Sequence, residues 1–318
     1  MAKDRYESIN EALDIPSFHE YLEVQLAHLP KLRDVEQLSP RVIRVLGQNP
    51  GKFSLQGTNT YIVGTGSTRI IIDTGQGYKE WIELIKNTLK RYSISLSHVL
   101  LTHWHGDHTG GVPDLINQYP GLVDSVFKHS PTAEQRPIHD GERFHVKGAT
   151  IRALHGEGHS FDHMCFILEE ENSMFTGDNI LGHGTTAVEH LGLYMQTLEK
   201  MKAQGCFQAY PAHGDIVKDL DTKIKGEINV KTGREDVCLR ALGNIKSEAI
   251  RSGRFSGATV SEIVTRMHGK DVEEGLRNKV LEPFVAEVLK KLAEDGRVIF
   301  HVRGGVRRWI LIEGLREL

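Results

Sequence analysis

The segment Leu100-Leu-Thr-His-Trp-His-Gly-Asp-His-Thr-Gly-Gly111 holds four potential metal ligands, His103, His105, Asp107 and His108, within six consecutive positions. It completes the run SHVLL, which has the composition of a buried strand. Neutral imidazole and carboxylate are suitable ligands for zinc and similar divalent ions. A turn from strand to helix lets alternate side chains converge, and the glycines that follow permit close backbone approach. The segment therefore predicts a metal site at the end of a strand.

Six positions cannot fill two metal sites, so further ligands are expected downstream at strand ends. Three candidates occur in such places. His159 follows IRAL in LHGEGHSFDH, Asp178 follows SMFTG, and His213 lies in AYPAHGD after an apolar strand. Each has a neighbouring glycine that allows a tight turn. These three residues extend the predicted site.

The segments around these motifs alternate between strands and helices. Short β-branched runs bounded by glycine begin at Val42, with RVIRVLG, NTYIVGTG and TRIIIDTG as examples. Later strands are predicted at 124–128, 142–145, 149–154, 163–168, 172–176 and 207–210. Helices are predicted at 79–92, 112–119, 186–203 and 215–229. This pattern predicts two sheets packed face to face and covered by helices.

The composition changes near Asn229. Beyond it, helices are predicted at 234–251, 259–267 and 275–295. They lead into GRVIFHV-RGG-VRRWILI, which indicates two strands joined by a glycine turn. Three helices followed by a two-stranded wing look like a winged-helix module.

Composition limits the classes of function. The 318 residues are 39% hydrophobic and 25% charged, which is ordinary for a globular protein, and the net charge of -3 gives no global attraction to nucleic acid or anionic lipid. Cys165, Cys206 and Cys238 are widely spaced, which favours a reducing compartment over a disulfide scaffold. The N-terminus resembles neither a secretory signal nor a transit peptide, and no apolar run has the length of a membrane span. We therefore predict a soluble, cytoplasmic protein without a membrane partner.

The motifs HWHGDH, GH, TGD and AHG, in this order, resemble the metallo-β-lactamase superfamily over about residues 40–215. The resemblance implies an α+β fold, an αββα sandwich, with the winged-helix-like region at its C-terminal end. On this basis we expect a helical extension at 1–37, with a helix at about 17–32, the metallo-β-lactamase domain at 38–228 and the winged-helix-like domain at 229–318. No cysteine stands at a matched position, which favours the all-His/Asp hydrolase branches such as glyoxalase II, the RNase Z-like enzymes and thioesterases.

The resemblance also implies seven metal ligands, with His103, His105 and His159 on one metal, Asp107, His108 and His213 on another, and Asp178 bridging them. Two divalent ions are implied, with zinc expected and manganese or iron as alternatives. Two such ions about 3.5–4 Å apart hold a bridging hydroxide that attacks a carbonyl or phosphorus. Asp107 is predicted to be catalytic, because it can orient this nucleophile and take its proton.

Several other residues have two possible roles. Asp73 in IIIDTG either orients a metal ligand, as the resemblance implies, or caps its own turn. Asp162 and His163 either support the ligands or belong to a plain loop. His155, His183 and His190 either line the active-site cleft or occupy ordinary positions at the surface or in the core. Four further residues belong either to a loop at the rim of the active site or to a simple turn between strands: Asn49, Gln56, Thr58 and Asn59.

Three longer segments resemble one branch of the superfamily: RVIRVLGQNPGKFSLQGTNTYIVGTG, THWHGDHTGGVPDLI and GDNILGHGTT. This branch contains stand-alone thioesterases that release an aromatic polyketide from the acyl-carrier protein of fungal non-reducing polyketide synthases. It also contains a mitochondrial endoribonuclease that cuts single-stranded RNA. The first activity is our main hypothesis, because the N-terminal extension resembles the polyketide-associated members and a thioester has a good leaving thiolate.

The implied partners are the acyl-carrier protein and its polyketide thioester. Basic residues of the wing could dock the carrier electrostatically or could simply be solvated: Arg297, Arg303, Arg307 and Arg308. Under the alternative hypothesis of an endoribonuclease, these arginines would contact RNA phosphates. The acidic net charge and the lack of a basic strip interleaved with aromatic residues weigh against RNA. Hydrolysis of small thioesters, as in glyoxalase II, is a third hypothesis.

Overall fold

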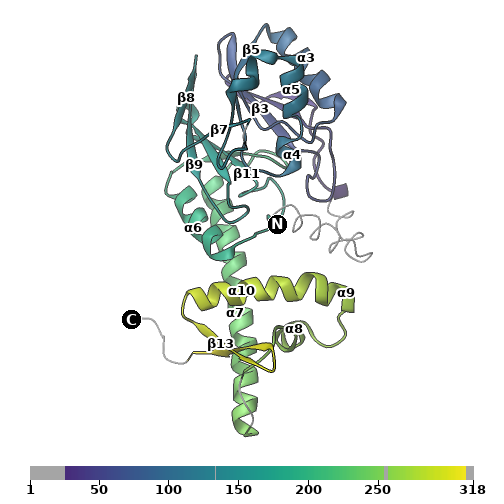
Figure 1. Ribbon diagram of the computed structural model, residues 1–318, viewed down its shortest axis with the longest axis vertical. Coiled ribbons are helices and arrows are strands. Elements are labelled where there is room, and N and C mark those ends of the chain that lie inside the picture. Colours follow the sequence, from purple (N-terminus) through teal and green to yellow (C-terminus); the bar gives the residue numbers. More distant parts are fainter. Residues whose placement is uncertain (1–25, 133, 254–256, 313–318) are drawn as a thin grey trace. The chain divides into compact units, whose positions relative to one another are not determined.

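The computed structural model describes residues 26–132, 134–253 and 257–312 (Figure 1). The chain forms two compact units. One comprises Val24–Gly226, called here the core unit, and the other includes Glu227–Leu318, called the C-terminal unit. The helix predicted at 17–32 falls largely outside the described residues, and so does most of the predicted extension 1–37. No helix among the described residues is long and apolar enough to cross a membrane.

The first sheet of the core unit has seven strands in sequential order. The strands are β1 Val35–Gln37, β2 Val42–Leu46, β3 Asn59–Val63, β4 Thr68–Ile72, β5 Ser95–Leu100, β6 Val126–Lys128 and β7 Arg136–Pro137. The pairs from β1 to β4 are antiparallel, whereas β4 to β7 are parallel. The change to parallel pairing puts the carboxyl ends of β4 and β5 at one edge of the sheet, where HWHGDH begins.

The second sheet has five strands in the order β12-β11-β10-β9-β8. The strands are β8 Arg143–Val146, β9 Ala149–His155, β10 Met164–Leu168, β11 Ser173–Gly177 and β12 Gln208–Pro211. β11 and β12 are parallel, and the other neighbours are antiparallel. His159 lies in the loop between β9 and β10, while Asp178 and His213 follow β11 and β12.

Alternation along the strands explains the layers. Val42 of β2 belongs to the apolar core shared by both sheets, whereas its neighbour Ile43 packs with Trp81 and Ile85 on the outer side of the first sheet. Strands buried on both faces read as continuous apolar runs, as Ile70–Ile72 of β4 does. Four helices of the described residues lie wholly within the core unit: α3 Lys79–Tyr92, α4 Gly106–Thr109, α5 Val112–Gln118 and α6 Leu191–Lys202. A 3-10 helix, η1, spans Pro120–Ser125, and a second one, η2, spans Glu169–Glu171.

The core unit is thus an αββα sandwich, and the predicted fold class is confirmed. Two predicted boundaries near the second sheet and η1 were wrong. The helix predicted at 186–203 begins only at Leu191, because His190 is extended and its side chain caps the helix by accepting a hydrogen bond from Leu193 N. The strand predicted from 124 begins at Val126, after η1.

A third wrong prediction concerns the two helices at 215–229 and 234–251. The structure has one continuous helix there, α7 Leu220–Arg251. Gly226 and Gly233 lie within it with no positive φ, and no proline interrupts it. A single glycine costs a helix only about 1 kcal/mol relative to alanine, which does not end a helix of this length.

The C-terminal unit has the winged-helix-like pattern. After α7 come α8 Val260–His268, the helical stretch of α9 Glu274–Leu276, η3 Arg277–Leu281 and α10 Glu282–Glu294, and the hairpin of β13 Val298–Arg303 and β14 Val306–Leu311. Thr259 and Glu262 form a capping box at the start of α8. Gly304 and Gly305 both have positive φ in the hairpin turn, which explains the RGG wording. Trp309 pairs through its backbone with Ala258, which fixes the hairpin to the start of α8.

Candidate metal centre

The seven residues predicted as ligands come from five separate strand ends, loops and turns. His103 and His105 follow β5, and Asp107 and His108 lie in the short helix α4. The others lie after β9, β11 and β12 in the second sheet. Their ligand atoms form two neighbouring groups, each within 4.8 Å: His103, His105, His159 and Asp178 in one, Asp107, His108 and His213 in the other.

In the first group, three imidazole nitrogens face one point. His103 Nε2 lies 2.8 Å from His105 Nδ1 and 3.2 Å from His159 Nε2, and the remaining pair is 3.1 Å apart. Nitrogens at these separations can all reach one ion at the usual zinc–nitrogen distance of about 2.0–2.1 Å.

Asp178 faces both groups with different oxygens. Its Oδ2 lies 3.5 Å from His159 Nε2 in the first group. Its Oδ1 lies 3.2 Å from His213 Nε2 and 3.5 Å from His108 Nε2 in the second group. Asp107 Oδ2 lies 3.2 Å from the same His213 nitrogen. One carboxylate therefore lies between the two groups of ligand atoms.

Burial and neighbouring charges set the protonation of this cluster. Burial, followed by repulsion from His159, lowers the pKa of His105 to about 3, so its imidazole is neutral as a ligand must be. Burial lowers the pKa of His213, but Asp178 and Asp107 outweigh burial and raise this pKa to about 9, so a metal ion at this nitrogen would displace a proton. Burial also raises the pKa of Asp107, but His108 and His213 outweigh it and hold the pKa well below its usual range. The carboxylate of Asp107 is therefore ionised at neutral pH.

The polar atoms at the centre of the cluster fit metal ions. Nε2 of His108 and the Oδ1 atoms of Asp107 and Asp178 are buried without a hydrogen-bond partner among the described residues. Buried polar atoms are normally satisfied, and these lie among the other ligand atoms of the cluster. A divalent cation suits such a set of nitrogens and oxygens. The His/Asp cluster is thus able to bind metal ions, while the identity of the individual ligands stays a prediction.

Asp73 supports the cluster from below. It follows β4 in the left-handed region, with φ 58°, and its Oδ2 lies 2.8 Å from His108 Nδ1. Its Oδ1 accepts a hydrogen bond from Thr102 N at 2.8 Å. A carboxylate on the far nitrogen of a histidine fixes the ring and its tautomer. The direct contact with His108 therefore supports the orienting role predicted for Asp73.

His159 and Asp178 are held by similar contacts. His159 Nδ1 lies 2.8 Å from the carbonyl oxygen of Ala187 and 2.9 Å from Thr186 Oγ1. The backbone N–H of Asp178 donates to His163 Nε2 at 3.0 Å. His163 is therefore not part of a plain loop, because it fixes the turn that carries Asp178.

Three of the four candidate residues before and at the start of β3 contribute to the centre, directly or through a neighbour. Asn49 binds the backbone and hydroxyl of Thr58, and Thr58 Oγ1 lies 3.5 Å from Asp107 Oδ2. Asn59 donates to the carbonyl oxygens of Pro211 and Gly214, at 2.8 Å each, and so holds the turn that carries His213. Gln56 instead donates to Pro30 O.

Lys128 is a supporting residue that was not predicted. Its ammonium group contacts Asp162 Oδ2 at 2.5 Å and the carbonyl oxygens of His129 and Ser130. Both charged side chains are buried, so each requires the other. This pair anchors the loop that carries His159. The signal in the sequence was a lysine closing the apolar strand β6, which is uncommon unless the charge is paired.

Gly111 explains the glycines after the histidine motif. A Cβ atom there would lie 2.1 Å from Thr74 O and 2.6 Å from the ring of Trp81. The close backbone approach predicted for this segment is confirmed. Backbone and ring both block a side chain, so the motif can pack against the end of β4 only with glycine at this position.

The remaining candidate histidines lie outside the two groups of ligand atoms. The rings of His155 and His129 lie with their centroids 4.1 Å apart at an angle of 32°, and His190 caps α6. His183 is half-buried in the loop after β11. A role for these residues in lining the cleft stays a prediction.

Comparison with known proteins defines the class of the chain. The sequence profile of the metallo-beta-lactamase superfamily matches residues 54–213. The chain belongs to this superfamily. A beta-lactamase domain protein from Burkholderia ambifaria has a TM-score of 0.68 at 19% identity, covering 89% of this chain and 95% of that one. A metallo-beta-lactamase family protein from Thermus thermophilus has a TM-score of 0.65 at 20% identity, covering 87% and 100%. These two likenesses concern the fold alone.

More similar relatives extend over the whole chain. The chain is 61% identical over 312 residues to the Aspergillus aculeatus protein named atrochrysone carboxyl ACP thioesterase AacuM, covering 98% of this chain and 100% of that one. It is 58% identical over 317 residues to the protein of the same kind named AgnL7 from Paecilomyces divaricatus, covering 100% of both. It is 60% identical over 309 residues to the lactamase-like protein notP of an Aspergillus species, covering 96% of both.

Proposed function

We propose that this protein is a stand-alone thioesterase that hydrolyses the bond between an aromatic polyketide and the acyl-carrier protein of a non-reducing polyketide synthase. The observation that carries the proposal is the 61% identity, along almost the whole chain, to a relative named as an ACP thioesterase. The His/Asp cluster supplies the chemistry that such an activity needs. We place the activity in the cytoplasm, because Cys165, Cys206 and Cys238 are free and buried, as suits a reducing compartment.

We assign one metal ion to His103, His105 and His159 and a second to Asp107, His108 and His213, with Asp178 between them. The distances of 2.8–3.2 Å among the three nitrogens of the first group support this division. Zinc is the metal proposed, because borderline imidazole and carboxylate ligands suit it. Two divalent ions held there would supply an activated water and would stabilise negative charge that develops on the substrate.

Asp107 is proposed as the catalytic residue of the chain itself. Its Oδ1 has no hydrogen-bond partner within the described part of the chain, while its Oδ2 is surrounded by His108, His213 and Thr58. The low pKa of this carboxyl keeps it ionised, so it can accept a hydrogen bond from the attacking water and fix its direction. Water oxygen then bonds to the thioester carbonyl carbon, the carbon–sulfur bond breaks, and the products are a carboxylic acid and the carrier thiol.

The decisive experiment uses acyl-carrier protein loaded with an aromatic polyketide. We expect the zinc-loaded protein to release free acid and to leave carrier thiol, both followed by intact-protein mass spectrometry. A chelator should abolish this release, and added zinc should restore it. Retention of the acyl group on the carrier, together with metal-dependent cleavage of single-stranded RNA, would contradict the proposal and favour the endoribonuclease hypothesis.

A further inference from the structure

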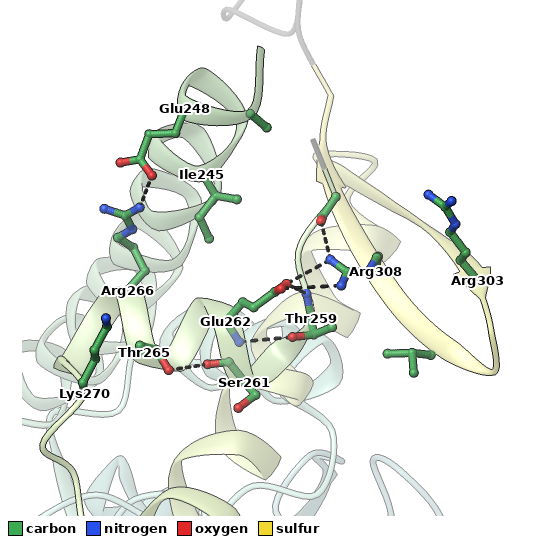
Figure 2. Close-up of a pocket in the computed structure, with 13 residues that line it drawn as sticks. Ile245, Glu248, Thr259, Ser261, Glu262, Thr265, Arg266, Lys270, Arg303 and Arg308 are labelled. Atoms are coloured by element: carbon green, nitrogen blue, oxygen red, sulfur yellow. Dashed lines mark hydrogen bonds and ion pairs between the residues drawn. The ribbon is translucent and has the colours of Figure 1, made fainter. Parts of the chain in front are cut away.

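The C-terminal unit contains a groove of about 1120 Å³ with its own set of charged residues (Figure 2). One wall is the end of α7, with Ile245 and Glu248. The floor is α8, with Glu262 and Arg266, and the other wall is the β13–β14 hairpin. All of the residues that line it belong to the C-terminal unit. The groove is therefore a separate feature from the metal centre.

The charges in the groove are unequal. Four basic side chains line it, against two acidic ones, which are Glu248 and Glu262. Glu248 is paired with Arg266, and Glu262 accepts from Arg308 at 3.0 Å (Figure 2). Lys270 and Arg303 form no ion pair within the described part of the chain. The groove therefore presents two positive charges, and no carboxylate among the described residues neutralises either of them.

Apolar side chains accompany these cations on the hairpin. Arg303 is opposite Val306 in the strand register, and Ile299 is opposite Ile310. Because side chains alternate along a strand, these residues share the face of the hairpin that lines the groove. Val306 is 48% exposed and Ile299 is 53% exposed, so apolar surface lies open beside the charge.

The other wing arginines differ from Arg303 in their surroundings. Arg308 is held by Glu262 and by the carbonyl oxygen of Gly257 at 2.9 Å. Arg307 lies on the opposite face of the hairpin, over the ring of Phe300 at 4.2 Å. Arg297 is exposed just before β13. Among these four, Arg303 is thus the arginine of the groove available to an external carboxylate.

We propose that this groove and the adjoining hairpin face are the docking surface for the acyl-carrier protein, an inference that rests on the proposed function. A carrier domain is a small helical module with an acidic surface. Its carboxylates complement Lys270 and Arg303, and its apolar side chains fit Ile299 and Val306. Interfaces that combine an apolar centre with complementary charge favour a specific protein partner.

The same groove is poorly suited to RNA. Glu248 and Glu262 lie inside it, so phosphates would be placed close to two carboxylates. Among the described residues no aromatic side chain lines it, so bases would lack a stacking platform there. An acidic protein can place its carboxylates at the two cations and its apolar atoms elsewhere, whereas an RNA strand carries charge at every nucleotide.

The test compares two substrates with the same acyl group, one on the carrier protein and one on N-acetylcysteamine, a small thiol. We expect Arg303→Glu and Lys270→Glu each to raise KM for the carrier-bound substrate about tenfold, because each places a carboxylate against an acidic partner. The small thioester should be hydrolysed with unchanged KM and kcat. Lys279→Glu is the matched control, since Lys279 is exposed in the same unit but outside the groove.

Direct binding separates docking from catalysis. Fluorescence anisotropy with labelled, unacylated carrier should show the same tenfold weakening for both groove variants, and binding should weaken as salt is added. Unchanged KM and unchanged anisotropy in both variants would overturn the docking proposal, as would an equal loss in Lys279→Glu. Loss of single-stranded RNA binding in the groove variants with intact carrier binding would reassign the groove. Failure of the unmodified protein to hydrolyse either thioester would instead remove the proposed function, and the docking proposal with it.

Discussion

The metal centre and the groove of the C-terminal unit use charged and polar residues in opposite ways. At the metal centre the polar side chains are buried, and His108 is held in place by the carboxylate of Asp73. In the groove the charged side chains are on the surface, and the two ion pairs there use single exposed carboxylates, Glu248 and Glu262. Buried networks fix positions closely, whereas exposed ion pairs contribute only about 0–1 kcal/mol and adapt readily. The difference is that between a site for chemistry and a surface for recognition.

The largest effect is expected from removing ligands at the metal centre. His103→Ala combined with His105→Ala should lower kcat/KM on carrier-bound substrate by roughly 10,000-fold, because the activated water would be lost. Metal content, measured by mass spectrometry of the digested protein, should fall as well. His145→Ala is the control, because His145 is exposed on β8 and belongs to neither ligand group. Full metal content and full activity in the double variant would refute the ligand assignment and remove the contrast between the two regions.

An intermediate effect is expected from Asp73→Asn. This change keeps the shape of the side chain but removes the charge that faces His108 Nδ1. Loss of such a supporting contact typically lowers metal affinity about 10–100-fold. Competition with a fluorescent chelator measures the affinity, and Asp124→Asn on η1 is the control because Asp124 is exposed. An unchanged affinity would mean that Asp73 only caps its own turn.

The smallest effect concerns the backbone of the C-terminal unit. Gly233→Ala in α7 should raise the free energy of unfolding by up to about 1 kcal/mol, since a Cβ there meets no atom within 4 Å and alanine favours a helix. Gly304→Ala is the opposite case, because the φ of Gly304 is +59° in the hairpin turn. Urea denaturation followed by circular dichroism measures both. A loss of stability in Gly233→Ala would contradict the continuous helix.

Short motifs in the sequence predicted the fold class and the candidate ligands of the metal centre. HWHGDH follows a buried strand and lies in one turn, so four candidate ligands could be identified together. The three distant ones were found from their glycine neighbours and from the resemblance. The supporting contacts could not be found this way: Asn59 and Gly214 are 155 positions apart, and Lys128 and Asp162 are 34 apart. Such pairs exist only after the strands are in register.

Two other features were also out of reach of the sequence. The helices predicted on either side of Asn229 are one helix, and a change of composition is weak evidence for a helix end. The groove depends on which residues of α7, α8 and the hairpin meet, and no motif marks them. On the sequence alone, the four arginines of the wing were treated alike. The strand register shows that Arg303 and Arg307 lie on opposite faces of the hairpin.

The three cysteines have a practical consequence for measuring turnover. Burial raises the pKa of Cys165 and of Cys238 to about 12 each, and that of Cys206 to about 11. Thiol reagents react with the thiolate, so buried thiols with raised pKa values react slowly. The thiol released from a small thioester substrate is free in solution and reacts at once. A thiol-reactive dye should therefore follow each turnover continuously by colour, with little background from the protein itself.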